Sequence, residues 1–310
     1  MADRPRLVAL VLNWRLPTET LRVLEDLRAL EQPGLHTLLI DNGSGDDSAQ
    51  RLQVAAEFDP NTDCLVFERN LGYCAALNRG IAWAAERGAE FVLFLNNDVR
   101  IPAGSLSPLV DVLENDPAVG AVGPTIVDTD GRAWSQGGGV AFRPNLVYLR
   151  NQGGEPAPRT AGPEEVEFLP GACALFRLDS LQRAGGLDED YFMYWEDVDL
   201  GHRLRAVGQK SVWLPWVSIV HDPSRSSGGG RSPLRKYMMG VNTVRYLRRY
   251  GTWSSWAAFL LFECLLWPLA FVSGTGVRGA MAKGRGIVAG LLGHRITAAD
   301  VDRLQPRGEA

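Results

Sequence analysis

The segment FVLFLNND at residues 91–98 is an apolar run that ends abruptly in three polar residues. A continuous apolar run of this length is typical of a strand buried on both faces, as in the middle of a parallel sheet. Such a strand gains no stability from Asn-Asn-Asp at its tip, and Pro102 stops it from continuing. Because open α/β sheets bind ligands beyond the carboxyl ends of their strands, residues 96–98 form a candidate site for a metal ion or a phosphate.

Strands and helices alternate through the first hundred residues. Apolar runs that end in polar residues predict strands at 7–12, 37–40, 64–67 and 91–95, and helical periodicity begins near Thr18, Ser48 and Cys74. This succession predicts an α/β fold with a parallel sheet and right-handed crossovers.

The second half is less regular. The pattern predicts a helix over 106–115, a short strand over 119–122, turns and hairpins over 128–165, and an apolar segment with small residues at its centre over 168–176. Further along it predicts a helix near Asp179, a helix that follows YFMYWEDVDL (191–200), and strands over 211–214 and 218–221.

The chain changes character from Tyr237 onward. Tyr237, Val241, Val244 and Leu247 form one stripe of a helix whose other face is basic, and residues 253–272 are strongly apolar around a central Glu263. A central carboxylate is costly inside a bilayer, so we expect this region to lie at a membrane surface rather than to span it. The alternative is that these are core or dimer helices, which leaves a homo-oligomer open.

Composition restricts the partners and the compartment. The net charge of −4 gives no basic field that would collect nucleic acid. The four cysteines contain no CxxC pair and predict reduced thiols, and the first residues run into a strand without an apolar signal region. We therefore expect a protein on the cytoplasmic side.

Polar groups at several strand ends should meet at one edge of the sheet. They are Asn13, the pair Asp41 and Asn42, residues 96–98, and the loop from Asn70 to Asn78. Carboxylate and amide oxygens suit a nucleotide held with Mg²⁺ or Mn²⁺. No GxxxxGK[ST] loop is present and no GxGxxG follows the first strand, which argues against P-loop and dinucleotide-binding folds.

Six motifs in order give the chain a specific resemblance. NW (13–14), DNGS (41–44), RNLGY (69–73) with Asn78, NND (96–98), PGA (170–172) and WEDVDL (195–200) resemble those of family 2 glycosyltransferases, over about residues 6–250. The chain is most similar to the rhamnosyltransferase-like branch.

This resemblance implies a GT-A fold, a Rossmann-like, mainly parallel sheet with an acceptor-side extension, here followed by C-terminal apolar helices. It divides the chain into a catalytic domain at 1–236, with a nucleotide-sugar-binding half (1–125) and an acceptor-side half (126–236), and a C-terminal helical region at 237–310. It implies sugar transfer with inversion, plausibly of rhamnose, from a dTDP- or UDP-sugar, assisted by Mg²⁺ or Mn²⁺. The acceptor would be a glycan or a polyprenyl-linked molecule at the inner face of the cell membrane.

The resemblance also assigns donor-side residues. Asp41 would bind the nucleotide base, with Asn13 and Asn42 in the same pocket, and Asn70 and Asn78 would lie near the base and ribose. Asp98 would ligate the metal that bridges the diphosphate, beside Asn97, whereas Asn96 stands where the family more often has an acid. His221 corresponds to a metal ligand of related enzymes, although a lone histidine is often a packed residue.

On the other side of the pocket, Asp197 is the candidate general base, and Glu196 is the neighbouring candidate. Repulsion among Glu196, Asp197 and Asp199 should raise at least one pKa and strengthen a weak base. Acids also favour the first turn of a helix, which is the structural alternative. Trp195 could stack on a sugar ring, and Gly171 and Ala172 would lie on the acceptor side.

Two further segments are rich in charged residues. Residues 188–190 (DED) predict a solvated loop, and Arg225 and Arg231 could form a lid or belong to an exposed linker. The alternatives to a glycosyltransferase are a nucleotidyltransferase and a non-catalytic nucleotide-sugar-binding protein, the latter favoured by Asn96.

Overall fold

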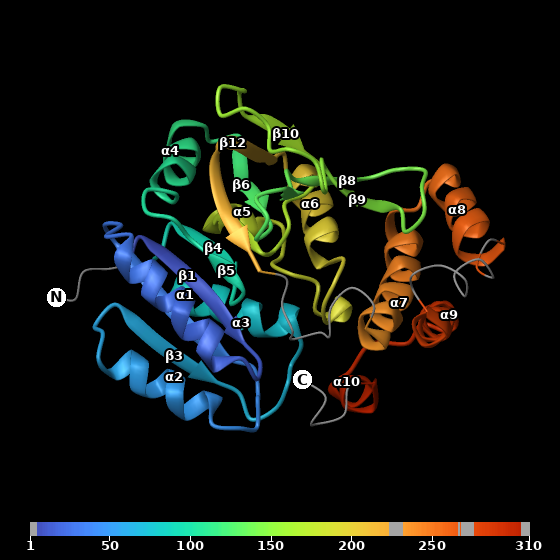
Figure 1. Ribbon diagram of the computed structural model, residues 1–310, viewed down its shortest axis with the longest axis horizontal. Coiled ribbons are helices and arrows are strands. Elements are labelled where there is room, and N and C mark those ends of the chain that lie inside the picture. Colours follow the sequence, from blue (N-terminus) through green and yellow to red (C-terminus); the bar gives the residue numbers. More distant parts are fainter. Residues whose placement is uncertain (1–4, 223–231, 266, 268–275, 305–310) are drawn as a thin grey trace.

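The computed structural model of the chain describes residues 5–222, 232–265, 267 and 276–304 (Figure 1). Its centre is a ten-stranded sheet with the main order β10-β12-β6-β11-β4-β1-β2-β3, in which β5 pairs with β12 and β7 with β6. Helices cover both faces, so the protein has the three-layer arrangement that the strand and helix succession predicts.

The first half confirms the predicted βαβ succession. Strands β1 to β4 are parallel to one another, with α1, α2 and α3 as their connections. Their bounds are β1 Leu7–Asn13, α1 Pro17–Ala29, β2 Leu35–Asp41, α2 Ser48–Glu57, β3 Thr62–Val66, α3 Tyr73–Glu86 and β4 Phe91–Asn96. Asn13 pairs with Asp41 and Leu12 with Asn96, so the polar tips end at the same edge.

The two faces of the sheet carry different helices. Apolar side chains of α1 and α4 pack with one set of strand residues, whereas α3, α5 and α6 pack with the alternate set. Every apolar residue of β4 is buried, as expected for a strand covered on both faces.

The second half differs from the sequence prediction at two strands. Residues 211–214 and 218–221 belong to a single strand, β12 (Lys210–His221), whose pairing with β6 shifts register between Leu214 and Ser218. Pro215 lies within this irregularity, where its missing N–H costs no ladder hydrogen bond, and this proline caused the prediction of two strands. Strand β6 (Val119–Val127) also runs five residues beyond the predicted end at Val122.

The other elements of this half are short. They are β5 Val99–Arg100, α4 Ser107–Asn115, β7 Ala133–Ser135, β8 Gly138–Val140, β9 Val147–Leu149, β10 Glu164–Val166, β11 Cys173–Arg177, α5 Leu178–Arg183, the 3-10 helix η1 Glu189–Tyr191 and α6 Glu196–Ala206. Strand β11 is antiparallel to both β4 and β6, so the sheet is mostly but not wholly parallel.

The C-terminal part is helical, with α7 (Pro233–Tyr250), α8 (Trp253–Phe259), a π-helix η2 (Leu260–Leu265), α9 (Gly276–Leu291) and α10 (Ala298–Leu304). The stripe predicted on α7 is buried. Helix α7 buries the face that carries this stripe, and α9 buries the face that packs against α7. No described helix is both long and apolar enough to cross a bilayer.

Glu263 has a structural explanation. Its buried carboxylate forms an ion pair with Lys283 of α9 and accepts a hydrogen bond from the backbone N–H of Asn145 at 2.8 Å. The charge at the centre of the apolar stretch therefore joins two parts of the folded chain. Of the apolar stretch 253–272, residues 266 and 268–272 lie outside the described residues.

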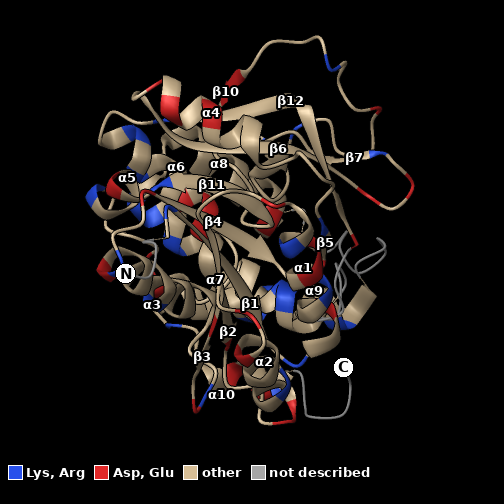
Figure 2. Cartoon of the chain, turned by 90° about the vertical axis from the view of Figure 1, so that its left-hand side faces the viewer, with Lys and Arg blue, Asp and Glu red and all other residues tan. Residues whose placement is uncertain are grey.

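Basic and acidic residues are interspersed over most elements (Figure 2). Neither sign dominates the ribbon as a whole, which agrees with the small net charge of −4.

Helices α7 and α9 cross in direct backbone contact, and glycines make this possible. A Cβ atom on Gly286 would clash with the carbonyl group of Tyr237, and one on Gly290 would lie 2.8 Å from the carbonyl oxygen of Val241. Gly240 on α7 faces the carbonyl group of Lys283 in the same way. The crossing therefore depends on the absence of side chains on both helices.

We predict that Gly286→Ala destabilises the protein by about 1–3 kcal/mol, because the methyl group forces the two backbones apart. Chemical denaturation measures this change. Gly162→Ala is the matched control, since a Cβ atom there meets no other atom within 4 Å. Equal stability of the two variants would contradict the close crossing.

Candidate active site

A cavity of about 390 Å³ opens at the edge of the sheet where β1 and β4 end. Its walls come from four parts of the chain: the tips of the parallel strands, residues 168–172, residues 192–198 at the start of α6, and α7. Figure 1 shows that α7 lies beyond α6 on the far side of this edge. Donor-side candidates, such as Asn42, Asn70 and Asp98, and the acceptor-side candidates thus share one pocket.

Asp98 and His221 meet at the base of this pocket. The Oδ2 atom of Asp98 lies 3.3 Å from Nε2 of His221, and both side chains are buried. The pairing of β5 with the end of β12, in which His221 pairs with Val99, brings them together. Oδ1 of Asp98 and Nδ1 of His221 have no hydrogen-bond partner.

This pair fits a divalent cation. A carboxylate and an imidazole with unused buried atoms are suitable ligands, and Mg²⁺ or Mn²⁺ commonly takes its remaining ligands from substrate phosphates. Among the described residues no group of three or more His, Cys, Asp or Glu could hold a metal alone. A cation here would therefore need oxygens from a bound ligand.

The other two residues of the NND motif occupy different positions. Asn96 lines the pocket, half-buried, whereas Asn97 is buried and donates a hydrogen bond through Nδ2 to Oγ1 of Thr20 at 3.1 Å. Asn97 also lines the pocket, so it reaches both the cavity and the core beneath it.

Asn13 and Asp41 form a buried network beneath the pocket. Thr20 donates to Oδ1 of Asn13, and Nδ2 of Asn13 donates to Oδ1 of Asp41 at 2.7 Å. Ser44 donates to Asp41 through both its hydroxyl and its backbone N–H. These two residues are absent from the lining of the described pocket, so they support its wall rather than form it.

Asn42 and Asn70 are on the pocket surface and fix each other. Nδ2 of Asn42 donates to Oδ1 of Asn70 at 3.1 Å, and Oδ1 of Asn42 accepts from the backbone N–H of Leu71 at 2.9 Å. The loop before α3 is therefore tied to the tip of β2.

Asn78 has a different role from the one expected. Its amide donates to the carbonyl oxygen of Leu187 at 2.8 Å and accepts from the backbone N–H of Leu187 at 2.9 Å. It is not among the residues that line the described pocket. Because both amide atoms are used by Leu187, Asn78 holds α3 to the loop before η1, and we do not assign it to the donor.

The turn that leads into α6 is conformationally strained. Phe192, Tyr194 and Trp195 have φ angles of 62°, 71° and 74°, in a region that costs about 1–2 kcal/mol for each non-glycine residue. This turn aims the start of α6 at the pocket. Its geometry must be maintained by neighbouring contacts.

Asn242 on α7 supplies these contacts. Its buried amide nitrogen lies 2.9 Å from each of three backbone carbonyl oxygens, those of Tyr191, Met193 and Tyr194. Its two N–H bonds are therefore directed at three carbonyl groups of the strained turn, with one N–H shared between two acceptors. The sequence signal for this role is a polar residue, Asn242, next to Val241 on the buried face of an amphipathic helix.

The three acids that begin α6 have distinct environments. Asp199 is fully buried and accepts from Nε of Arg203 at 2.7 Å, from the Tyr250 hydroxyl at 2.9 Å and from Arg249 at 3.3 Å. It is committed to these partners and does not line the described pocket. This removes Asp199 as a candidate base.

Asp197 and Glu196 both line the pocket. Burial raises the pKa of Asp197 to about 6, against hydrogen bonds from backbone N–H groups that lower it. Burial, and then the neighbouring Asp197 carboxylate, raise the pKa of Glu196 well above its usual range. Oε2 of Glu196 is buried without a hydrogen-bond partner. A carboxylate with a pKa near 6 is an effective proton acceptor at neutral pH, which favours Asp197.

The acceptor-side candidates also border the cavity. Gly171 accepts a hydrogen bond through its carbonyl oxygen from the hydroxyl of Tyr73 at 3.1 Å, and Ala172 follows it. Trp195 lines the pocket but is 97% buried, with its ring 4.7 Å from that of Tyr246. Little of its ring is available for a sugar.

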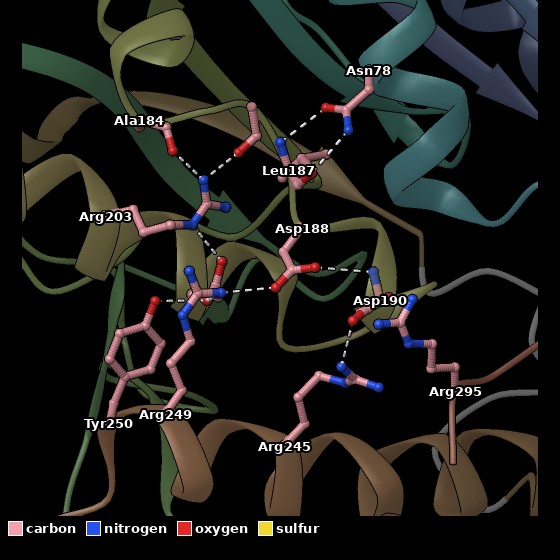
Figure 3. Close-up of polar contacts among 12 residues, drawn as sticks. Asn78, Ala184, Leu187, Asp188, Asp190, Arg203, Arg245, Arg249, Tyr250 and Arg295 are labelled. Atoms are coloured by element: carbon pink, nitrogen blue, oxygen red, sulfur yellow. Dashed lines mark hydrogen bonds and ion pairs between the residues drawn. The ribbon is translucent and has the colours of Figure 1, made fainter. Parts of the chain in front are cut away.

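Residues 188–190 form an ion-pair network rather than a solvated loop. Asp188 pairs with Arg249, and Asp190 pairs with Arg245 and Arg295 (Figure 3). The sequence could not show that basic residues of α7 would face these acids. The candidate lid residues Arg225 and Arg231 lie outside the described residues.

We predict that Asn242→Asp destabilises the protein by about 3–5 kcal/mol at neutral pH, because it places an unpaired buried carboxylate against three carbonyl oxygens. Burial raises the pKa of this carboxyl in the folded state, so the loss should shrink as the pH falls towards about 4, below which the group is protonated in the unfolded chain as well. Denaturation at the two pH values measures it. Asn61→Asp, at an exposed position, is the control, and a similar loss there would contradict the role of Asn242.

Comparison with known proteins identifies relatives in sequence and in structure. The family model for glycosyl transferase family 2 matches residues 15–185, more than half of the chain. The chain is 32% identical over 288 residues to N-acetylglucosaminyl-diphospho-decaprenol L-rhamnosyltransferase of Mycobacterium tuberculosis, covering 85% of this chain and 90% of the relative.

Two solved structures share the fold. GalNAc-T7 with UDP, GalNAc and Mn²⁺ superposes with a TM-score of 0.63 at 14% identity, covering 90% of this chain and 54% of that one. The mannosyltransferase PcManGT from Pyrobaculum calidifontis, in complex with GDP-Man and Mn²⁺, superposes with a TM-score of 0.57 at 19% identity, covering 99% and 89%. The sheet with its pocket at the strand ends is the GT-A fold, and the chain belongs to family 2 of the glycosyltransferases.

Proposed function

We propose that this enzyme transfers rhamnose, with inversion, from a nucleotide diphosphate donor such as dTDP-rhamnose to a polyprenyl-linked glycan acceptor at the inner face of the cell membrane. The observation that carries the proposal is one pocket that contains both a buried Asp98–His221 pair and a carboxylate with a pKa near 6. The rhamnosyltransferase relative, whose name specifies a lipid-linked acceptor, supports the choice of sugar and acceptor. UDP-sugars are the alternative donors to test.

The donor diphosphate is placed at the Asp98 end of the pocket. Asp98 and His221 would hold Mg²⁺ or Mn²⁺, which would neutralise negative charge on the leaving diphosphate. Asn70, Asn96 and Asn97 present amide groups on this side, suited to hydrogen bonds with base, ribose and sugar hydroxyls. Asn42, whose amide is bonded to Asn70 and Leu71, would hold the loop before α3 in place. Asn13 and Asp41 would act from beneath, by fixing the loop that carries Asn42.

The acceptor approaches from the side of Gly171, Ala172 and the strained turn. Asp197 takes the proton from the acceptor hydroxyl while its oxygen forms a bond to the anomeric carbon. The bond from that carbon to the diphosphate oxygen breaks on the opposite face, and the nucleoside diphosphate leaves with the electron pair. Configuration at the carbon is inverted in this single displacement. Burial raises the pKa of Glu196 well above its usual range, which favours the protonated carboxyl that can donate a hydrogen bond.

We predict that Asp197→Asn reduces transfer by at least about 10²-fold with donor affinity nearly unchanged, because only proton removal is lost. In the unaltered enzyme kcat/KM should fall as the pH drops below about 6, the pKa of Asp197. Steady-state kinetics across pH measures both effects. Full activity of Asp197→Asn would overturn the assignment.

The same variant should be more stable than the parent at pH 7. The folded state raises the pKa of Asp197 above its value in the unfolded chain, so its charge costs about 2–3 kcal/mol above pH 6 and nothing below about pH 4. Thermal unfolding at pH 7 and pH 4 separates these cases. Asp179→Asn, at an exposed position, is the control for general charge effects.

We predict that Asp98→Ala abolishes the dependence of nucleoside diphosphate binding on Mn²⁺. Calorimetry should show that the parent enzyme binds the nucleoside diphosphate more tightly in the presence of Mn²⁺ than in its absence. The variant should show no such gain in affinity. A chelator added to the parent enzyme should weaken its nucleoside diphosphate binding to the level of the variant. An unchanged response to Mn²⁺ in Asp98→Ala would remove this carboxylate from the metal site.

A further inference from the structure

The outer face of α9 is apolar where a surface helix is normally polar. Val277, Met281, Val288 and Leu292 are 55%, 43%, 57% and 83% exposed. Spacings of four, seven and four residues place them on one line along the helix, the last just beyond its end. The opposite face is used by the glycine contacts with α7, so nothing in the described fold covers this outer stripe.

The charges of α9 are all of one sign. Arg278 and Arg285 are exposed on the outer side, Lys283 is turned inward to Glu263, and the helix contains no Asp or Glu. An exposed apolar line flanked by arginines is the pattern of a helix that lies in the headgroup region of an anionic membrane.

A basic cavity adjoins the C-terminal end of this stripe. It has a volume of about 480 Å³ and is lined by three arginines of α7, by Arg295 and by the end of α9. The α7 arginines are Arg245, Arg248 and Arg249. Figure 3 shows the guanidinium groups of Arg245, Arg249 and Arg295 directed at Asp188 and Asp190.

Two carboxylates line this cavity against four guanidinium groups, so it keeps a net positive charge. Arg245 and Arg295 share Asp190, and Arg249 pairs with Asp188. Arg248 instead donates to the backbone carbonyl oxygen of Leu291 at 2.7 Å, and no ion pair joins it to a carboxylate within the described residues. A bound phosphate group would compensate the surplus positive charge of the cavity.

We propose that the outer stripe of α9 and the cavity at its end form a docking site for anionic phospholipid. A lipid phosphate binds in the cavity beside Arg248 and Arg295, and Val277, Met281, Val288 and Leu292 insert among the acyl chains near the headgroups. Helix α8, which exposes Trp253, lies at the same end of the molecule, beyond α7 (Figure 1). The inference rests on the proposed action at a membrane and specifies the surface that makes contact.

Vesicle flotation with the full chain tests the proposal. The parent protein should bind vesicles of phosphatidylcholine mixed with the anionic lipid phosphatidylglycerol, and should not bind vesicles of phosphatidylcholine alone. Arg248→Gln/Arg295→Gln should weaken this binding, roughly fivefold for each arginine lost near the surface. Met281→Asp/Val288→Asp should abolish it. Arg22→Gln, an exposed arginine on α1, is the matched control and should bind like the parent.

Several results would overturn the proposal. Two of them are equal binding to both kinds of vesicle and unchanged binding by the two double variants. The third is binding of millimolar inorganic phosphate in the cavity by a protein that does not bind vesicles. The fourth is association of the protein with itself through α9. Thermal unfolding of each variant excludes loss of fold as the cause of weak binding.

Transfer to a water-soluble acceptor analogue separates this inference from the enzymatic proposal. The double variants should retain that activity, because the altered residues lie outside the catalytic pocket. Vesicle binding without transfer activity would contradict the proposed function alone, and transfer without vesicle binding would contradict the docking site alone.

Discussion

The catalytic geometry depends on the contact between one amide group and three carbonyl oxygens. Asn242 of α7 holds the strained turn at 192–195, and that turn sets the direction in which Glu196 and Asp197 leave the backbone. The donor side of the pocket instead lies where strands of the sheet end together, and hydrogen bonds between neighbouring strand ends, such as that from Asn13 to Asp41, hold it. The two sides of the site are therefore positioned by different interactions. The register of the sheet places the donor side, and long-range hydrogen bonds from Asn242 hold the turn that precedes α6.

This division explains how much of the protein could be predicted from the sequence. Apolar runs with polar tips predicted the parallel strands and the edge at which Asn42 and residues 96–98 meet, because both features are local. The same reasoning placed Asn78 at the donor, although its amide binds Leu187. Position in a motif does not reveal which way a side chain on α3 turns.

Longer-range features escaped prediction for the same reason. Pro215 reads as a break between strands, and only the pairing of β12 with β6 shows that one strand passes through it. The sequence alone predicts that the acids at 188–190 are solvated, but arginines of α7 pair with them. Glu263 is likewise unexpected in an apolar stretch until its ion pair with Lys283 is known. In each case the partner is more than fifteen residues away in the sequence, and charge alone does not identify it.

The position of Asn242 along the chain has a consequence for biosynthesis. A chain that has left the ribosome as far as residue 222 contains every strand of the sheet, and with them Asp98 and His221. It also contains the turn at 192–195, but not the Asn242 amide whose hydrogen bonds stabilise this strained turn. Domains fold from the N-terminus as they are synthesised, so the nucleotide-binding half can assemble while the catalytic half is still immature. In the proposed mechanism, the start of α6 would then reach its working geometry late, when α7 docks and Asn242 meets the turn.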